Sequence, residues 1–139
     1  MNNKDELLRR FLRYVAVTSQ SDASVVSVPS TKGQTELAKL LAKDLEELGL
    51  TDISVDEHSI VYGTLQGNTE GPVVGFVSHL DTVDVSLNPD IHPQVIHYEG
   101  GDVLLNKERE IYIRVSEHPE LQNYVGQDII FSDGTSVLG

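Results

Sequence analysis

The chain has 139 residues, which is enough for one ordinary domain with a hydrophobic core. With 22 acidic residues against 10 basic ones, its formal net charge of -12 disfavours binding to nucleic acid or to anionic membrane surfaces. It has no cysteine, so any metal would have to be held by His, Asp or Glu, and its charged start and lack of a long apolar run predict a soluble cytoplasmic protein.

The first part of the sequence predicts a helix and then a long loop. Asn3 and Glu6 have the spacing of a capping box, and apolar residues then recur at helical intervals, which predicts a helix from about residue 4 to residue 17. The segment 18–31, TSQSDASVVSVPST, is rich in small and polar residues, so we expect a loop of unusual length for a compact domain.

A second helix and three strands are expected next. Leucines form one apolar stripe over residues 34–48, and Gly49 stands where a glycine commonly ends a helix. Residues 52–57 and 59–67 have strand character. Residues 71–81, GPVVGFVSHLD, are apolar at nearly every position from Val73 to Val77, which predicts a strand buried on both faces of a sheet.

The second half of the chain gives weaker signals. Residues 88–105 and 107–126 mix turn residues with a β-like segment, EIYIRV, and a possible short helix at 119–124. Residues 128–139, DIIFSDGTSVLG, predict a strand, an Asp-Gly turn at 133–134 and the start of another strand. We find no repeat, low-complexity tract or domain boundary.

The candidate site is the pair His79 and Asp81, directly after the third predicted strand. In an extended backbone residues i and i+2 point to the same side, and ligand sites in such sheets lie beyond the carboxyl ends of the strands. One imidazole nitrogen could bind a divalent metal while the carboxylate accepts a hydrogen bond from the other ring N–H. His-x-Asp alone is a short pattern with frequent false matches, and an ordinary surface pair is the simpler interpretation.

Other polar residues give no comparable pattern. No partner at metal-ligand spacing accompanies the other four histidines, which we interpret as exposed or structural: His58, His92, His97 and His118. Asp84 stays unassigned, because the direction of its side chain is not fixed by the pattern. The triplet 81–83 lacks the glycine of the aspartic protease motif, and EGGD at 99–102 has no phosphate-binding pattern.

The segment GFVSHLDTVD, residues 75–84, resembles the segment that carries the first metal ligand in the dinuclear zinc exopeptidases. The resemblance is strongest to the tripeptide aminopeptidases of that family. It extends in order along the whole chain, through LLRRFLRYVAVTSQSD, PSTKGQTELAKLLAKDLEELGL, YGTLQGN, NPDIHPQVIHYEGGDVLL and FSDGTSVLG. It implies an α/β catalytic domain with a mixed β-sheet flanked by helices, of which residues 1–139 are the incomplete N-terminal portion.

The resemblance also implies roles for the candidate site. His79 would bind one of two zinc ions, Asp81 would orient His79 and count among the catalytic residues, and the substrates would be tripeptides, from which the N-terminal residue is removed. In that family the bridging Asp, a Glu pair, a further carboxylate and a last His follow a segment like DGTSVLG, so they are expected beyond Gly139.

These missing ligands predict the behaviour of the chain alone. Zinc catalysis needs about three protein ligands, a water and a base, so we expect weak zinc binding and no peptide hydrolysis. Missing strands would leave an exposed sheet edge that favours self-association. Two alternatives stay open: a non-catalytic binding module that keeps a half-fold, and a dipeptidase or amide deacylase of the same superfamily.

Overall fold

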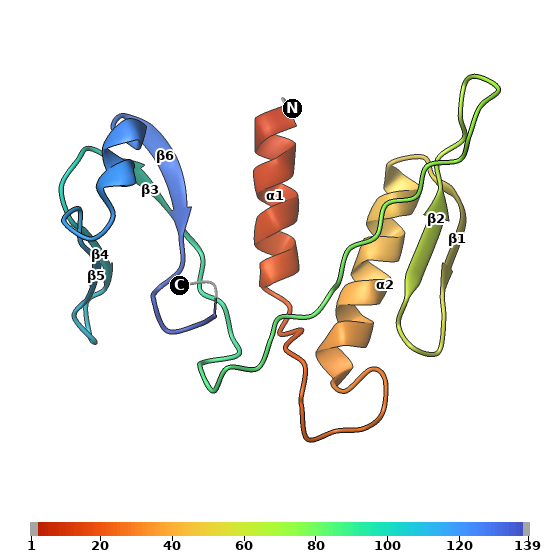
Figure 1. Ribbon diagram of the computed structural model, residues 1–139, viewed down its shortest axis with the longest axis horizontal. Helices are drawn as coiled ribbons and strands as arrows, with labels where there is room; N and C mark the ends of the chain where they lie inside the picture. The colour runs from red at the N-terminus through yellow and green to blue at the C-terminus, as the bar shows by residue number, and fades with distance from the viewer. Residues whose placement is uncertain (1–2, 138–139) are drawn as a thin grey trace. The chain divides into compact units, whose positions relative to one another are not determined.

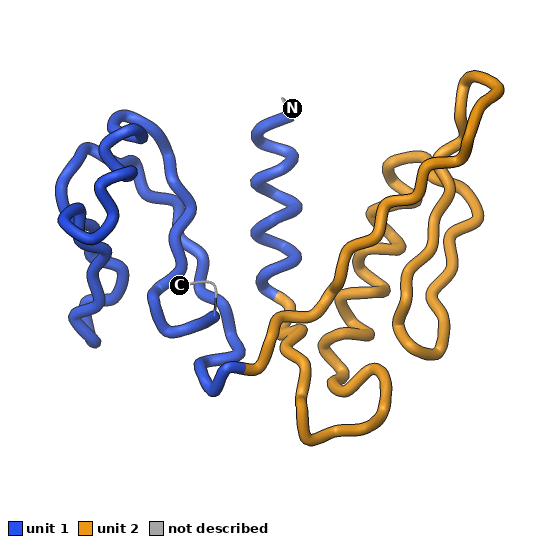
Figure 2. Tube along the Cα trace, viewed as in Figure 1, with its two compact units in different colours: residues 1–16, 85–139 blue, residues 17–84 orange. Residues whose placement is uncertain are grey.

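The structure is a computed structural model that describes residues 3–137. Its elements in chain order are α1 (Asn3–Val15), α2 (Lys32–Glu47), β1 (Thr51–Val55), β2 (Val61–Thr64), β3 (Gln94–Tyr98), β4 (Val103–Asn106), β5 (Ile111–Ile113), a 3-10 helix η1 (Pro119–Tyr124) and β6 (Gln127–Phe131) (Figure 1). The chain divides into two compact units, one formed by residues 17–84 and the other by residues 1–16 and 85–139 (Figure 2).

In the unit 17–84, α2 packs beside the antiparallel hairpin β1–β2. At its start the Gln34 side chain accepts a hydrogen bond of 3.1 Å from the backbone N–H of Thr31. At its end Gly49 adopts a φ of +83°, a conformation that glycine reaches without strain. Gly63 of β2 allows close packing, since a Cβ there would lie 3.2 Å from the side chains of Leu45 and Leu50. The predicted second helix and first two strands are therefore confirmed.

Residues 71–81 do not form the predicted buried strand. The side chains of Val73, Phe76 and Val77 are 99%, 95% and 100% exposed, and no strand is assigned to the segment. A strand is stable only when its backbone groups pair with a neighbour, and β2 pairs with β1 alone among the described residues. The prediction is wrong for this structure because, within residues 3–137, no strand pairs with the segment and its apolar side chains are left uncovered.

The unit made of residues 1–16 and 85–139 contains α1 and four strands. β3 pairs with β6 and β4 pairs with β5, both antiparallel. Its core consists of buried side chains from these strands and η1: Tyr98, Val103, Leu105, Leu121 and Phe131. The first helix, the EIYIRV strand, the short helix at 119–124 and the strand before the Asp-Gly turn are confirmed, although α1 ends two residues earlier than expected.

The predicted α/β content is confirmed, and the strands pair as three two-stranded antiparallel sheets. Parallel pairing, which a mixed sheet requires, is confined within residues 3–137 to two isolated bridges, Gln20 with Thr82 and Asn88 with Ser136. Of the expected last strand the structure describes residues 135–137, in which only Ser136 forms a bridge, and residues 138–139 lie outside the described range. None of the helices described is long and apolar enough to cross a membrane.

Candidate functional site

The backbone around the candidate pair is held by the loop that joins α1 to α2. The Ser19 hydroxyl donates a hydrogen bond of 3.1 Å to the carbonyl of Leu80, and the backbone N–H of Ser21 donates one of 2.9 Å to the carbonyl of Thr82. Gly33 lies so close to this loop that a Cβ there would stand 1.7 Å from the carbonyl oxygen of Thr18. The loop, itself fixed at the start of α2, therefore anchors residues 80–82.

His79 and Asp81 lie together, as their spacing predicts. Nδ1 of His79 is 3.2 Å from Oδ1 of Asp81, and the two side chains are 81% and 34% exposed. A carboxylate only accepts hydrogen bonds, so this contact suits the tautomer with the ring proton on Nδ1, in which the lone pair of Nε2 is available to bind a metal. The proposed roles of the pair in metal binding and catalysis stay predictions.

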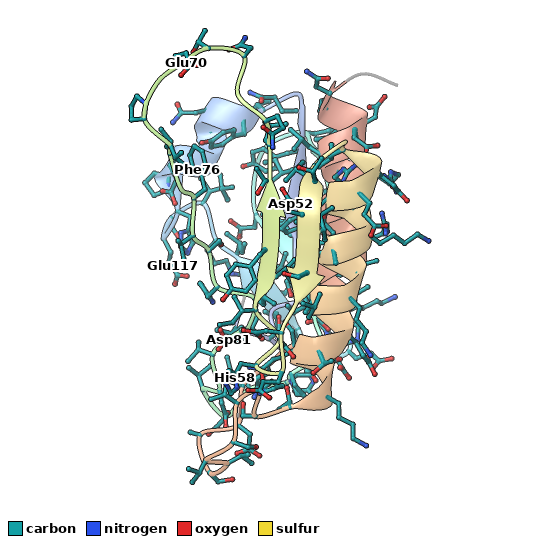
Figure 3. The ribbon with its side chains drawn as sticks, turned by 90° about the vertical axis from the view of Figure 1, so that its right-hand side faces the viewer. Asp52, His58, Glu70, Phe76, Asp81 and Glu117 are labelled. Carbon is teal, nitrogen blue, oxygen red and sulfur yellow. The ribbon has the colours of Figure 1, made fainter. Side chains whose placement is uncertain are left out.

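A groove of about 400 Å³ lies beside the pair. It is lined by residues 58–62, by residues 76–81, and by Val28, Pro29 and Gln34. Figure 3 shows Asp81 and His58 at the same end of the β1–β2 hairpin, with Phe76 farther along the segment that leads to Asp81. Sequence reasoning did not find this groove, because its walls come from segments whose proximity no local pattern reveals.

The other four histidines are 52–59% exposed at their side chains, and each lies near a carboxylate: His58 near Glu57, His92 near Asp133, His97 near Asp128 and His118 near Glu120. The pair of His97 and Asp128 joins facing residues of β3 and β6, with 2.8 Å between Nδ1 and Oδ1. This hydrogen bond holds the pKa of Asp128 below its usual value. The interpretation of these histidines as exposed or structural is confirmed.

The donor atoms near His79 are compatible with zinc but incomplete. An imidazole whose second nitrogen is oriented by a carboxylate is a common arrangement at zinc sites. Within residues 3–137, however, no group of three or more His, Asp or Glu side chains is placed to hold a metal ion. Among the described residues, the structure thus shows one imidazole close to a carboxylate and no complete metal site.

No protein-family model matches the chain. Among curated proteins it is similar to a peptidase T-like protein of Yersinia pestis, with 54% identity over 136 residues, 97% of this chain and 33% of that protein. A peptidase T-like protein of Rhizobium meliloti is 49% identical over 140 residues, covering 100% of this chain and 34% of that protein. Peptidase T of Geobacillus kaustophilus is 42% identical over 139 residues, 98% of this chain and 34% of that protein. The chain thus spans about a third of the length of these relatives.

Proposed function

Because this chain is related to peptidase T along nearly its whole length and corresponds to about a third of it, we propose that it forms part of a zinc-dependent aminopeptidase that removes the N-terminal residue from tripeptides. The observation that supports this proposal is the contact of 3.2 Å between Nδ1 of His79 and Oδ1 of Asp81. It leaves one ring nitrogen of an exposed histidine directed away from the carboxylate, which is what a metal ligand requires.

Each residue of the pair has a distinct task in the proposed enzyme. His79 holds one of two zinc ions through Nε2, and Asp81 keeps the ring proton on Nδ1 and fixes the orientation of the ring. The chemistry that zinc supplies when bound is Lewis acidity, which polarises a carbonyl and lowers the pKa of water. Asp81 is therefore a positioning residue that acts on the reaction through His79.

We also propose that the chain alone binds zinc weakly and does not hydrolyse peptides. One imidazole and one carboxylate fall short of the three ligands and the general base that hydrolysis by zinc enzymes requires. The test is to incubate the purified chain with a tripeptide and zinc and to measure the released amino acid by chromatography. Release that is catalytic and is abolished by a chelator would contradict this part of the proposal.

The site assignment is tested in a chimera in which this chain replaces the matching third of the Yersinia pestis relative. We expect His79→Ala to lower kcat/KM for a tripeptide by about 100-fold or more, and Asp81→Asn to lower it by about 10–100-fold. His97→Ala is the matched control, because His97 is also exposed and paired with a carboxylate but lies outside the candidate site. An active chimera that keeps its full activity with His79→Ala would refute the assignment.

A further inference from the structure

We propose that Ser19 is a positioning residue for the candidate site. It fixes the peptide group that precedes Asp81, and Asp81 in turn holds the ring of His79 in the orientation that binds zinc. The inference rests on the proposed function, because it assigns Ser19 a part in zinc binding by His79. Ser19 lies about sixty residues before the pair in the sequence and contacts neither of its side chains in the hydrogen bonds described.

The first argument is the hydrogen bond that Ser19 makes. Its side chain belongs to a residue that is only 4% exposed, and the hydroxyl donates a hydrogen bond of 3.1 Å to the carbonyl of Leu80. That carbonyl is part of the peptide group joining Leu80 to Asp81. Because a buried hydroxyl without a partner is costly, the hydroxyl and this peptide group hold each other in place.

The second argument is a further fixed point after Asp81. The carbonyl of Thr82 accepts hydrogen bonds from the backbone N–H of Ser21 at 2.9 Å and from its hydroxyl at 3.2 Å. Asp81 therefore lies between two carbonyls that the loop holds. On an extended backbone the backbone sets the side to which a side chain points, so the loop determines the direction of the Asp81 carboxylate.

The third argument is that Ser19 itself rests on the start of α2. The hydroxyl of Thr31, directly before this helix, donates a hydrogen bond of 2.8 Å to the carbonyl of Gln20. On the other side of Ser19, a Cβ at Gly33 would stand 1.7 Å from the carbonyl oxygen of Thr18 and 3.4 Å from the Cα of Ser19. Both neighbours of Ser19 are thus held by residues at the start of α2, which gives its hydroxyl a fixed position.

His79 has no comparable support of its own. Its side chain is 81% exposed, and its hydrogen bonds in the described part of the chain come from residues next to it, Ser78 and Asp81. The ring of His79 is therefore oriented by a carboxylate whose own direction depends on Ser19. Loss of a residue that orients a metal-binding histidine commonly lowers metal affinity by about 10–100-fold.

The first experiment uses the chain alone and needs neither zinc nor activity. Nitrogen NMR of the His79 ring, at a pH where the imidazole is neutral, measures the two tautomers. We expect the tautomer with the proton on Nδ1 to be enriched in the unmodified chain, and this enrichment to be lost in Ser19→Ala. Ser19→Thr keeps a hydroxyl and should preserve the enrichment. Ser19→Cys nearly keeps the volume but is a weak donor, so it should act like Ser19→Ala.

Ser21→Ala is the matched control for this experiment. It also removes a loop hydroxyl bonded to a carbonyl of residues 80–82, but the backbone N–H of Ser21 still donates to the carbonyl of Thr82. We therefore expect the tautomers of His79 to stay unchanged in this variant. An unchanged tautomer ratio in both Ser19→Ala and Ser19→Cys, or an equal change in Ser21→Ala, would overturn the proposal.

The second experiment measures zinc affinity and kinetics in the Yersinia pestis chimera, well below the thermal midpoint of each variant. We expect Ser19→Ala to lower zinc affinity and kcat by about 10-fold each with KM unchanged, because it disturbs the orientation of a metal ligand and not the binding of substrate. Ser19→Thr and Ser21→Ala should change neither. A lower thermal midpoint of Ser19→Ala without a change in zinc affinity would show a structural role only and contradict the proposal.

The two experiments separate this inference from the proposed function. Full activity of the chimera with His79→Ala would contradict the proposed function, while the tautomer ratio in the chain alone would still decide whether Ser19 sets the contact between Asp81 and His79. Loss of activity with His79→Ala, together with unchanged zinc affinity and kcat in Ser19→Ala, would contradict the positioning role of Ser19 alone.

Discussion

At the scale of single residues, the clearest electrostatic feature is the group of charges on α1. The carboxylate of Glu6 accepts hydrogen bonds from Arg9, at 3.0 and 2.7 Å, and from Arg10, at 2.6 Å. The hydrogen bond from Arg9 is the largest cause of a pKa of about 2 for Glu6, below the ordinary 4.5. These contacts, three and four residues apart, support a helix with no fully buried side chain among those described.

The depressed pKa of Glu6 predicts a pH dependence. A carboxylate whose pKa falls on folding stabilises the folded state above its unfolded pKa and loses that contribution as the pH falls toward the folded pKa. We therefore expect Glu6→Gln to lower the thermal midpoint by a constant amount above pH 4.5, with the difference from the unmodified chain shrinking between pH 4.5 and about 2.

Circular dichroism melts at several pH values measure this difference. Glu46→Gln is the control, since Glu46 is an exposed carboxylate on α2 with no side-chain hydrogen bond or ion pair among the described residues. Because Glu46→Gln removes no such contact, it should lower the thermal midpoint much less than Glu6→Gln does. A Glu6→Gln difference that stays constant down to pH 2 would show that the contacts with Arg9 and Arg10 do not stabilise α1.

At the scale of elements, β4 shows how alternation along a strand fixes the core. Leu105 is 7% exposed and packs with Tyr98 and Leu121, whereas Leu104, the next residue on the strand, is 41% exposed. Adjacent strand residues point to opposite faces, so the same side chain has different environments at these two positions.

Truncation of Leu104 and of Leu105 to alanine should show how much each side chain contributes to the free energy of unfolding. We expect Leu105→Ala to lower the free energy of unfolding by about 2–4 kcal/mol, because it removes buried methyl groups and leaves a cavity. Leu104→Ala should cost less than about 1 kcal/mol. Urea unfolding followed by tyrosine fluorescence measures both, since the chain has five tyrosines and no tryptophan. Equal costs would contradict the assignment of Leu105 to the core.

Elements whose stability depends on neighbours close in sequence are predictable here. The leucine stripe, Thr31 and Gly49 define α2 without reference to the rest of the chain, and Pro119 marks the start of η1. β3 was not predicted, because it lies between turn-forming residues and its partner β6 is about thirty residues further along the chain. β4 was not predicted either, although its partner β5 is close in sequence. The expected strand at 71–81 failed for a related reason, since apolar composition does not supply a pairing partner.

The same distinction applies to the candidate site. The contact between His79 and Asp81 follows from a spacing of two residues, so it could be expected before the structure was known. The anchoring of residues 80–82 by Ser19 and Ser21 joins segments about sixty residues apart, and no local pattern indicates it. Sequence spacing thus predicts pairs of side chains more readily than the segments that support them.

At the scale of the whole molecule, net charge and exposed apolar surface have opposite effects on the association of one copy of the chain with another. The net charge of -12 keeps copies of the chain apart, while residues 73–77 favour association by the burial of apolar surface. Salt strongly weakens the repulsion between the charged copies and changes the burial of apolar surface much less. Raising the salt concentration from about 0.1 M to about 1 M shortens the screening length from about 10 Å to about 3 Å.

We therefore expect the chain alone to self-associate weakly, with an average mass that rises with protein concentration and with salt. Light scattering after size-exclusion chromatography measures this mass. Val77→Asp should suppress the association, because it places a charge in the centre of the apolar segment, and Val26→Asp, at an equally exposed position outside the groove, should suppress it much less. Since each variant adds one negative charge, a difference between them reflects the position of the apolar surface and not net charge. A clean monomer at high concentration and 1 M salt would show that residues 73–77 do not drive association.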